Sequence, residues 1–260
     1  MSLNFAANLS FMFTELPFEA RFKAAARAGF RGVEFLFPYD HSPERIAELA
    51  RNAGVILALH NLSPGDWDAG ERGLAALDGR QSDFKTSVKQ AMHYCEATGL
   101  KQLHVMAGCV ADADRAAAWD IYLENLRYAV SQFAQAGITA LIEPINSTDM
   151  PGYLLNHAHA AVDAIHVVGA QNLKLQFDCY HAQIMDDDAL GDLCAHYGNI
   201  QHIQIASVPD RAEPDHGVCD YGAIFETLES LNYQGWIGCE YRPKGATTDG
   251  LGWFAKYSGA

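Results

Sequence analysis

Residues 138–146, which read Ile-Thr-Ala-Leu-Ile-Glu-Pro-Ile-Asn, decide the fold that the sequence predicts. A largely apolar run from Ile138 to Ile142 ends in the carboxylate of Glu143, and Pro144 follows at once. Such a run is typical of a buried parallel strand, and proline is excluded from the middle of a sheet. The pattern therefore predicts a strand whose last side chain, that of Glu143, faces a pocket.

Seven other apolar runs indicate strands, and helical patterns separate them. Glycine follows six of the predicted helices. Strands that alternate with helices predict a parallel sheet, and eight such units predict a closed barrel. Barrels of this kind commonly form one domain of about 250 residues, so the α/β class and a single (β/α)8 TIM-barrel domain over residues 1–260 are expected. The predicted strands are 3–9, 32–37, 55–60, 101–107, 138–143, 173–178, 200–206 and 235–240.

An open doubly wound sheet is the alternative architecture. Its nucleotide-binding form carries a glycine fingerprint directly after the first strand. The residues at that place, 8–12, read Asn-Leu-Ser-Phe-Met and contain no glycine. The barrel is therefore the favoured prediction.

Four consecutive predicted strands carry oxygen-bearing side chains at or near their ends: Glu143, Asp178, Gln204 and Glu240. In a barrel these ends lie around one mouth, where active sites are built. Three carboxylates that meet there would raise one another's pKa values, and a divalent cation relieves that conflict. A set of oxygen ligands suits Mg²⁺ or Mn²⁺ better than Zn²⁺. We expect these four residues to hold such an ion.

Several residues near these ends are candidates for binding a substrate. His181 follows Asp178 by three residues and could donate to a substrate oxygen or cap the next helix. Arg211 could bind an anion with its bidentate guanidinium, with Glu213 holding it in place, or form only a surface ion pair. The other candidates are Arg72 and Lys244, as cations, and His60, which ends the third strand and could equally be a packed core residue.

Composition limits the partners that the chain can take. A net charge of −14 argues against nucleic acid and anionic membranes, because phosphate groups are neutralised by Lys and Arg. The six cysteines form no C-x-x-C pair, and no basic segment followed by a long apolar run opens the chain. We expect a cytoplasmic protein that binds neither nucleic acid nor a membrane. A homo-oligomer is compatible with the sequence.

The sequence resembles the hydroxypyruvate isomerase family, within the larger group of xylose-isomerase-like barrels. Matching stretches cover almost the whole chain. They include Phe5-Ala6-Ala7-Asn8-Leu9-Ser10, Gly32-Val33-Glu34-Phe35-Leu36-Phe37-Pro38-Tyr39, His60-Asn61-Leu62, Ile142-Glu143-Pro144-Ile145-Asn146, Phe177-Asp178-Cys179-Tyr180-His181, Arg211-Ala212-Glu213-Pro214 and Gly235-Trp236-Ile237-Gly238-Cys239-Glu240-Tyr241. Residues 250–254 and 13–15 are similar to the related 2-oxo-tetronate isomerases.

The resemblance implies an activity and residue roles. It implies a small anionic hydroxy-oxo acid as substrate, and the interconversion of hydroxypyruvate and 2-hydroxy-3-oxopropanoate (tartronate semialdehyde) through a cis-enediolate. It implies that Glu143, Asp178, Gln204 and Glu240 hold the metal, and that Glu143 and Glu240 are the acid/base pair. The alternatives are a 2-oxo-tetronate isomerase or another small keto-acid or sugar isomerase or epimerase, a metal-dependent AP-endonuclease-like nuclease, and a non-catalytic sugar-acid binder.

Overall fold

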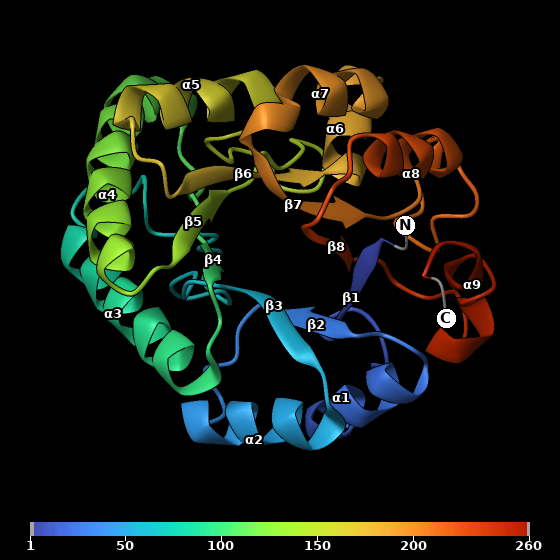
Figure 1. Cartoon of the computed structure of the whole chain (residues 1–260). Helices are drawn as coiled ribbons and strands as arrows, with labels where there is room; N and C mark the ends of the chain where they lie inside the picture. Colours follow the sequence, from blue (N-terminus) through green and yellow to red (C-terminus); the bar gives the residue numbers. More distant parts are fainter. Residues whose placement is uncertain (1–2, 259–260) are drawn as a thin grey trace.

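The computed structural model describes residues 3–258 and contains a closed barrel of eight parallel strands inside a ring of helices (Figure 1). Each strand pairs with its neighbours in chain order, and β1 (Asn4–Asn8) closes the barrel against β8 (Trp236–Cys239). This confirms the predicted (β/α)8 fold. Met1, Ser2, Gly259 and Ala260, at the ends of the predicted 1–260 domain, lie outside the described residues.

The remaining elements follow the alternation that the sequence predicts. The strands between β1 and β8 are β2 (Gly32–Phe35), β3 (Ile56–Asn61), β4 (Gln102–His104), β5 (Thr139–Ile142), β6 (Leu173–Asp178) and β7 (Ile200–Ile205). The α-helices are α1 (Phe18–Arg27), α2 (Pro43–Ala53), α3 (Gln81–Thr98), α4 (Arg115–Gln135), α5 (Ala158–Val168), α6 (Cys179–Asp186), α7 (Ala189–His196), α8 (Tyr221–Ser230) and α9 (Phe254–Tyr257). Three short 3₁₀ segments are η1 (Asp112–Asp114), η2 (Tyr197–Asn199) and η3 (Thr247–Gly250).

Helix α2 shows why the sequence marks its ends clearly. The Ser42 hydroxyl accepts a hydrogen bond from the Arg45 backbone N–H at 3.2 Å, and Pro43 occupies the first turn. Gly54 ends the helix with a φ of 73°, a conformation that costs glycine little. These local signals define both ends of this helix.

The structure differs from the prediction around β6. The predicted strand–helix alternation implies one helix between the strands that end at Asp178 and begin at Ile200, whereas the structure has two, α6 and α7. Helix α6 begins directly after the strand because the Asp178 carboxylate accepts from the Tyr180 backbone N–H at 2.8 Å. The strand residue is thus also the helix cap, with no intervening loop to signal a new element.

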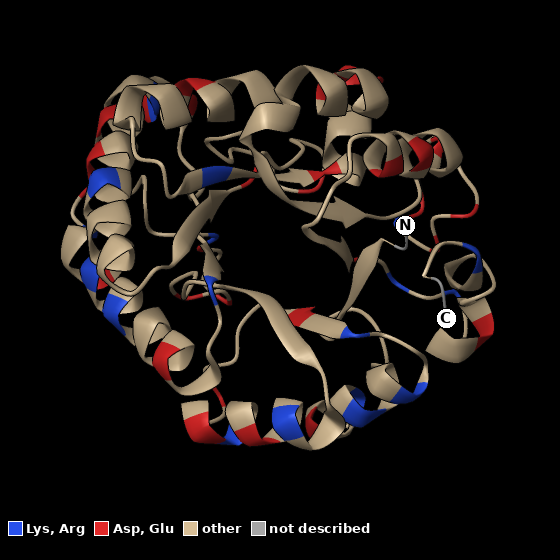
Figure 2. Cartoon of the chain, viewed as in Figure 1, with Lys and Arg blue, Asp and Glu red and all other residues tan. Residues whose placement is uncertain are grey.

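The outer layer is completed by the C-terminal segment. Trp253 and Phe254 pack against Phe5 of β1, with ring centroids 5.5 and 5.6 Å apart, and α9 lies beside α8 in the outer ring (Figure 1). Charged residues lie mainly on the outer helices (Figure 2). None of the helices among residues 3–258 is long and apolar enough to cross a membrane.

Inside the barrel, polar side chains lie beneath the mouth. Glu34, Gln176, His202 and Gln204 are each at most 1% exposed. Gly238 of β8 leaves the space that the Glu34 carboxylate occupies, because a Cβ atom there would lie 2.3 Å from Glu34 Oε1. The barrel interior therefore contains a layer of hydrogen-bonded polar side chains, and this layer supports the side chains at the mouth.

Candidate active site

Three of the four predicted strand-end residues, Glu143, Asp178 and Glu240, bring acidic side chains to the mouth of the barrel, whereas Gln204 lies one residue before the end of β7, beneath the mouth. Asp178 ends β6, while Glu143 and Glu240 each lie one residue past β5 and β8. All three are buried, at 3 to 6% exposure. Buried carboxylates are costly unless they are paired, so their partners decide what the site can do.

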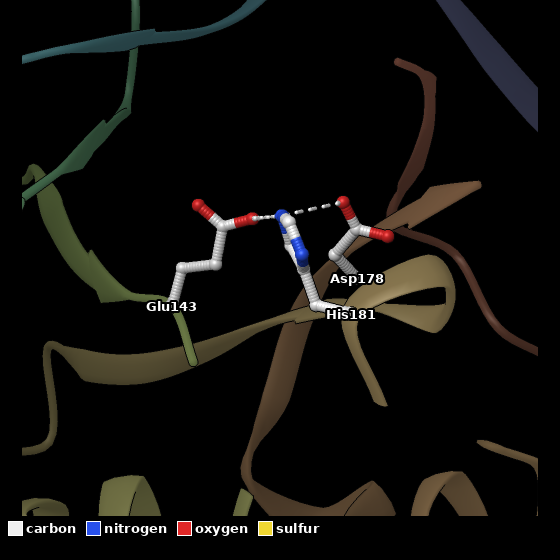
Figure 3. Close-up of side chains that lie close together, drawn as sticks. All are labelled: Glu143, Asp178 and His181. Atoms are coloured by element: carbon white, nitrogen blue, oxygen red, sulfur yellow. Dashed lines mark ion pairs between the residues drawn. The ribbon is translucent and has the colours of Figure 1, made fainter. Parts of the chain in front are cut away.

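Glu143 and Asp178 face each other across His181, which lies in the first turn of α6 (Figure 3). His181 Nε2 lies 3.9 Å from Glu143 Oε1 and 3.6 Å from Asp178 Oδ2. Among the described residues, neither oxygen accepts a hydrogen bond. Burial raises the pKa of Asp178 to about 6, and burial together with the charges of Glu240 and Asp178 raises the pKa of Glu143 well above its usual value.

The contacts of His181 with Asn146 set its tautomer, because they are shorter than the 3.5 Å contact between its Nε2 and Arg211 Nη2. Its Nδ1 accepts from the Asn146 backbone N–H at 3.4 Å and lies 2.6 Å from the Asn146 side-chain nitrogen. Burial, and then the Arg211 charge, lowers the pKa of His181 well below its usual value, so the ring is neutral. A neutral ring that accepts at Nδ1 carries its proton on Nε2. His181 therefore presents an N–H donor to the space between the two carboxylates.

Glu240 is held by three donors. Its Oε2 accepts from Asn8 Nδ2 at 2.9 Å and from Gln204 Nε2 at 2.6 Å, and its Oε1 accepts from Arg211 Nη2 at 2.8 Å. Burial raises the pKa of Glu240 to about 8. The carboxyl group is therefore oriented, and it can gain or lose a proton near neutral pH.

The donor set fits a divalent cation. Three buried carboxyl groups with raised pKa values would be relieved by a nearby cation, and two of their oxygens lack any donor among the described residues. Glu143, Asp178 and His181 place one ligand atom each within 4.8 Å of one another. Because His181 Nε2 carries a proton, the oxygens are the better ligands. Gln204 turns its amide oxygen toward Gln176 Nε2, 2.7 Å away, so its amide must turn over to ligate an ion.

A pocket of about 360 Å³ opens above these carboxylates. Glu143, His181 and Glu240 lie at its base, and Trp67 and Arg72 come from the long loop after β3. Its other lining residues include Phe11, Phe37, His104, Asp149, Arg211 and Arg242. A cavity of this size with convergent polar groups is typical of a small-molecule site.

Arg211 enters the pocket from the loop after β7. Its backbone has a φ of 51°, in the left-handed region, where a residue other than glycine is under local strain. Its guanidinium lies 3.5 Å from Asp149 Oδ2 and 4.8 Å from the centre of the Tyr180 ring. Arg211 is therefore held by Glu240, Asp149 and Tyr180 rather than by Glu213, the partner that the sequence suggested.

Three predicted substrate-binding residues lie elsewhere. His60 is buried between Phe35 and Tyr94, with ring centroids 6.3 and 5.9 Å away, and burial lowers its pKa to about 4. Glu213 accepts from the Lys244 backbone N–H at 3.1 Å, and the Lys244 ammonium lies 3.3 Å from Asp210 Oδ2. None of these three is among the residues that line the described pocket.

Arg242 is one of the pocket residues that the sequence did not predict. Arg242 follows Glu240 by two residues, and both line the pocket, whereas Tyr241 between them is fully buried. Side chains two residues apart in an extended segment lie on the same side. That alternation, counted from Glu240, was the signal that could have identified Arg242.

Comparison with known proteins places this geometry in a family. The chain matches the Xylose isomerase-like TIM barrel family over residues 22–257. It is 52% identical to a 2-oxo-tetronate isomerase of Cupriavidus necator, with 98% of each chain covered, and 41% identical to a hydroxypyruvate isomerase of Escherichia coli, with 98% and 99% covered.

A solved structure is also similar throughout. It is that of a Brucella melitensis protein named AP endonuclease, family 2, and it superposes with a TM-score of 0.96 at 48% identity, covering 99% of this chain and 100% of that one. The family match, the sequence identity to the relatives and the superposition on the solved structure each extend over nearly the whole length of the chain. The protein belongs to the xylose isomerase-like TIM barrel family.

Proposed function

We propose that the protein is an aldose–ketose isomerase that interconverts hydroxypyruvate and tartronate semialdehyde through a cis-enediolate. The observation that carries the proposal is the pair of buried carboxyl groups, Glu143 and Glu240, which face one pocket and have raised pKa values. The relatives named as hydroxypyruvate isomerase and 2-oxo-tetronate isomerase support the same reaction class.

The two carboxyl groups divide the proton transfers. One removes a proton from the hydroxymethyl carbon of hydroxypyruvate, and the other delivers a proton to the former carbonyl carbon. The hydroxyl proton passes from the oxygen on the first carbon to the oxygen on the second, so the atoms balance. His181 Nε2–H donates to one of these oxygens and holds the enediolate in its cis form. Arg211 keeps Glu240 oriented through its 2.8 Å contact.

Metal binding belongs to the same proposal. Glu143, Asp178, Gln204 and Glu240 would hold Mg²⁺ or Mn²⁺, through carboxylate and amide oxygens. When bound, such an ion polarises the carbonyl and stabilises negative charge on the neighbouring oxygens.

The four-carbon substrate of a 2-oxo-tetronate isomerase is the second candidate within this class. The relative from Cupriavidus necator, at 52% identity, favours it, and a pocket of about 360 Å³ accommodates the additional carbon. A turnover panel that compares hydroxypyruvate with 2-oxo-tetronate, with and without Mn²⁺, tests both. Conversion of either acid supports the isomerase proposal, and conversion of neither contradicts it.

Two other classes are distinguished by simple assays. The name of the Brucella melitensis protein favours an endonuclease, whereas the net charge of −14 opposes binding to a polyanion. Incision of a duplex that carries an abasic site would support the nuclease. A sugar-acid binder would bind the acids without exchanging their carbon-bound protons. A cytoplasmic location and a homo-oligomeric state stay predictions from sequence, and light scattering tests the second.

A further inference from the structure

Three arginines line the pocket, and two of them are already engaged. The Arg211 guanidinium contacts Glu240 at 2.8 Å, Asp149 at 3.5 Å and Asp178 at 4.0 Å. A cation surrounded by three carboxylates has little charge left for a ligand. Its contacts fit the positioning of Glu240 better than the capture of a free acid.

Arg72 is also occupied. Its Nη1 donates to the backbone carbonyls of Trp67 and Glu71, each at 2.8 Å, and its guanidinium lies 3.8 Å from the centre of the Trp67 ring. These contacts tie Arg72 into the loop that carries Trp67. Its main role is therefore to shape one wall of the pocket.

Arg242 differs from both. Its guanidinium contacts the face of Phe11, 5.4 Å from the ring centre, and within residues 3–258 no carboxylate or carbonyl accepts a hydrogen bond from it. The residue is exposed at the pocket mouth. All five N–H donors of this side chain remain available to a ligand.

The backbone places this cation close to the reacting groups. Arg242 and Glu240 line the same pocket, and two residues of extended chain span roughly 7 Å. The Arg242 backbone N–H donates to the Arg211 carbonyl at 2.8 Å, which fixes the segment after β8 against the loop after β7. Tyr241, on the opposite side, packs its ring 6.3 Å from that of Trp253. The backbone hydrogen bond of Arg242 and the packing of Tyr241 together fix the direction of the Arg242 side chain.

We propose that Arg242 binds the carboxylate of the substrate and makes the enzyme selective for acids over neutral sugars. The proposal rests on the isomerase function proposed above. In a chain of net charge −14, an uncompensated guanidinium at the pocket mouth draws small anions to an otherwise acidic site. Its planar fork matches both oxygens of a carboxylate, while the reacting carbons of the same small molecule reach Glu143 and Glu240.

The first test compares two compounds that differ only at this group. Dihydroxyacetone is hydroxypyruvate with the carboxylate replaced by a hydroxymethyl group. Arg242→Gln should lower kcat/KM for hydroxypyruvate by roughly 10- to 100-fold and leave that for dihydroxyacetone within about twofold, because only the acid loses a charged hydrogen bond. Arg242→Lys should fall between wild type and Arg242→Gln, since it keeps the charge and loses the fork. An equal loss for both compounds would overturn the proposal.

The matched control removes the same charge elsewhere. Arg51 is exposed on α2, outside the pocket, so Arg51→Gln should leave the ratio of the two kcat/KM values unchanged. If Arg51→Gln lowers the ratio as much as Arg242→Gln does, general attraction of anions accounts for the selectivity and Arg242 has no specific role.

A binding measurement separates this proposal from the isomerase function. Glycerate resembles hydroxypyruvate but has no carbonyl to isomerise, so calorimetry with glycerate and with glycerol reports carboxylate binding alone. Arg242→Gln should weaken glycerate binding roughly 10-fold or more without changing any response to glycerol. Unchanged glycerate affinity overturns the proposal, even if turnover is normal. The expected loss of affinity together with absent turnover by wild type refutes the isomerase function alone. Absence of glycerate binding by a wild type that still turns over hydroxypyruvate refutes the role of Arg242 alone.

Discussion

Glu34 and Glu240 are bridged by two amide groups that each donate to both carboxylates. Asn8 Nδ2 lies 3.1 Å from Glu34 Oε1 and 2.9 Å from Glu240 Oε2, and Gln204 Nε2 lies 2.8 Å and 2.6 Å from the same two atoms. The Ser10 backbone N–H donates to Asn8 Oδ1 at 3.0 Å, so the Asn8 amide cannot turn over without losing this bond. Glu34, inside the barrel, thereby orients the carboxyl group of Glu240 at its mouth.

Glu34→Gln should disturb this bridge without touching the substrate. The variant loses the charge that attracts both amides, so Glu240 becomes less well oriented. We expect kcat to fall roughly 10- to 100-fold while KM changes less than about threefold, the pattern of a positioning residue. Steady-state kinetics measure this. Glu226→Gln, on the exposed face of α8, is the control and should match wild type. A Glu34→Gln variant with normal kcat would contradict the role of the bridge.

Asp178→Asn tests the metal prediction. Asp178 Oδ2 is a buried oxygen without a donor among the described residues, and the substitution removes its charge. Mn²⁺ affinity, measured by electron paramagnetic resonance of the free ion, should fall by roughly 10-fold or more. Asp163→Asn, on the exposed face of α5, should bind as wild type does. Chelation should likewise abolish turnover, and readdition of Mn²⁺ should restore it. Full turnover after exhaustive chelation would refute the metal requirement.

His60 should contribute to acid destabilisation. Burial lowers its pKa to about 4, whereas the unfolded chain has a value near 6.5. As the pH falls, the unfolded state therefore binds a proton before the folded state does. The stability that is present above about pH 6.5 is lost as the pH falls toward 4, and His60 accounts for about 3 kcal/mol of that loss. His60→Phe should remove that part of the slope in urea unfolding between pH 6.5 and 4.

The substitution is otherwise mild. The Phe ring keeps the stacking against Phe35, and Tyr39 Oη still donates to the Asn61 carbonyl at 2.7 Å. At pH 7.5 the wild type and His60→Phe should therefore unfold at similar urea concentrations. An identical pH slope in the two proteins would show that His60 titrates normally.

Gly238→Ala tests the packing that accommodates Glu34. Its Cβ would lie 2.3 Å from Glu34 Oε1 and 2.4 Å from Oε2, and the carboxylate is fixed by its amide donors. The free energy of unfolding should fall by about 1–3 kcal/mol, the usual cost of overpacking. Gly252→Ala is the control, because a Cβ atom there has nothing within 4 Å and should change stability by less than about 0.5 kcal/mol. Equal stability of the two variants would disprove the tight fit.

The sequence predicted the barrel because its signals are local. Apolar runs, helix caps and helix-ending glycines repeat with a regular period, and the strand ends at Glu143, Asp178, Gln204 and Glu240 follow from that period. Helix α6 escaped prediction because Asp178 ends a strand and caps a helix at once. The dual use of one residue leaves no separate signal.

The partners within the site could not be predicted in this way. Glu34 meets Glu240 through residues of β1 and β7, which are distant in sequence. The pairing of Arg211 with Glu240 rather than with nearby Glu213 likewise depends on the closed barrel. Gln176, a neighbour across the β6–β7 pair, determines whether the Gln204 amide turns its oxygen or its nitrogen toward Glu240. Such contacts arise from tertiary packing, which local patterns do not encode.

The most direct test of the account is the incorporation of solvent deuterium during hydroxypyruvate turnover by wild type, Glu143→Gln and Glu240→Gln. If the two carboxyl groups transfer the protons, wild type places deuterium on the former carbonyl carbon, and each variant loses turnover by about 100-fold or more. If both variants keep near-normal turnover and deuterium incorporation, the two-carboxylate mechanism is wrong.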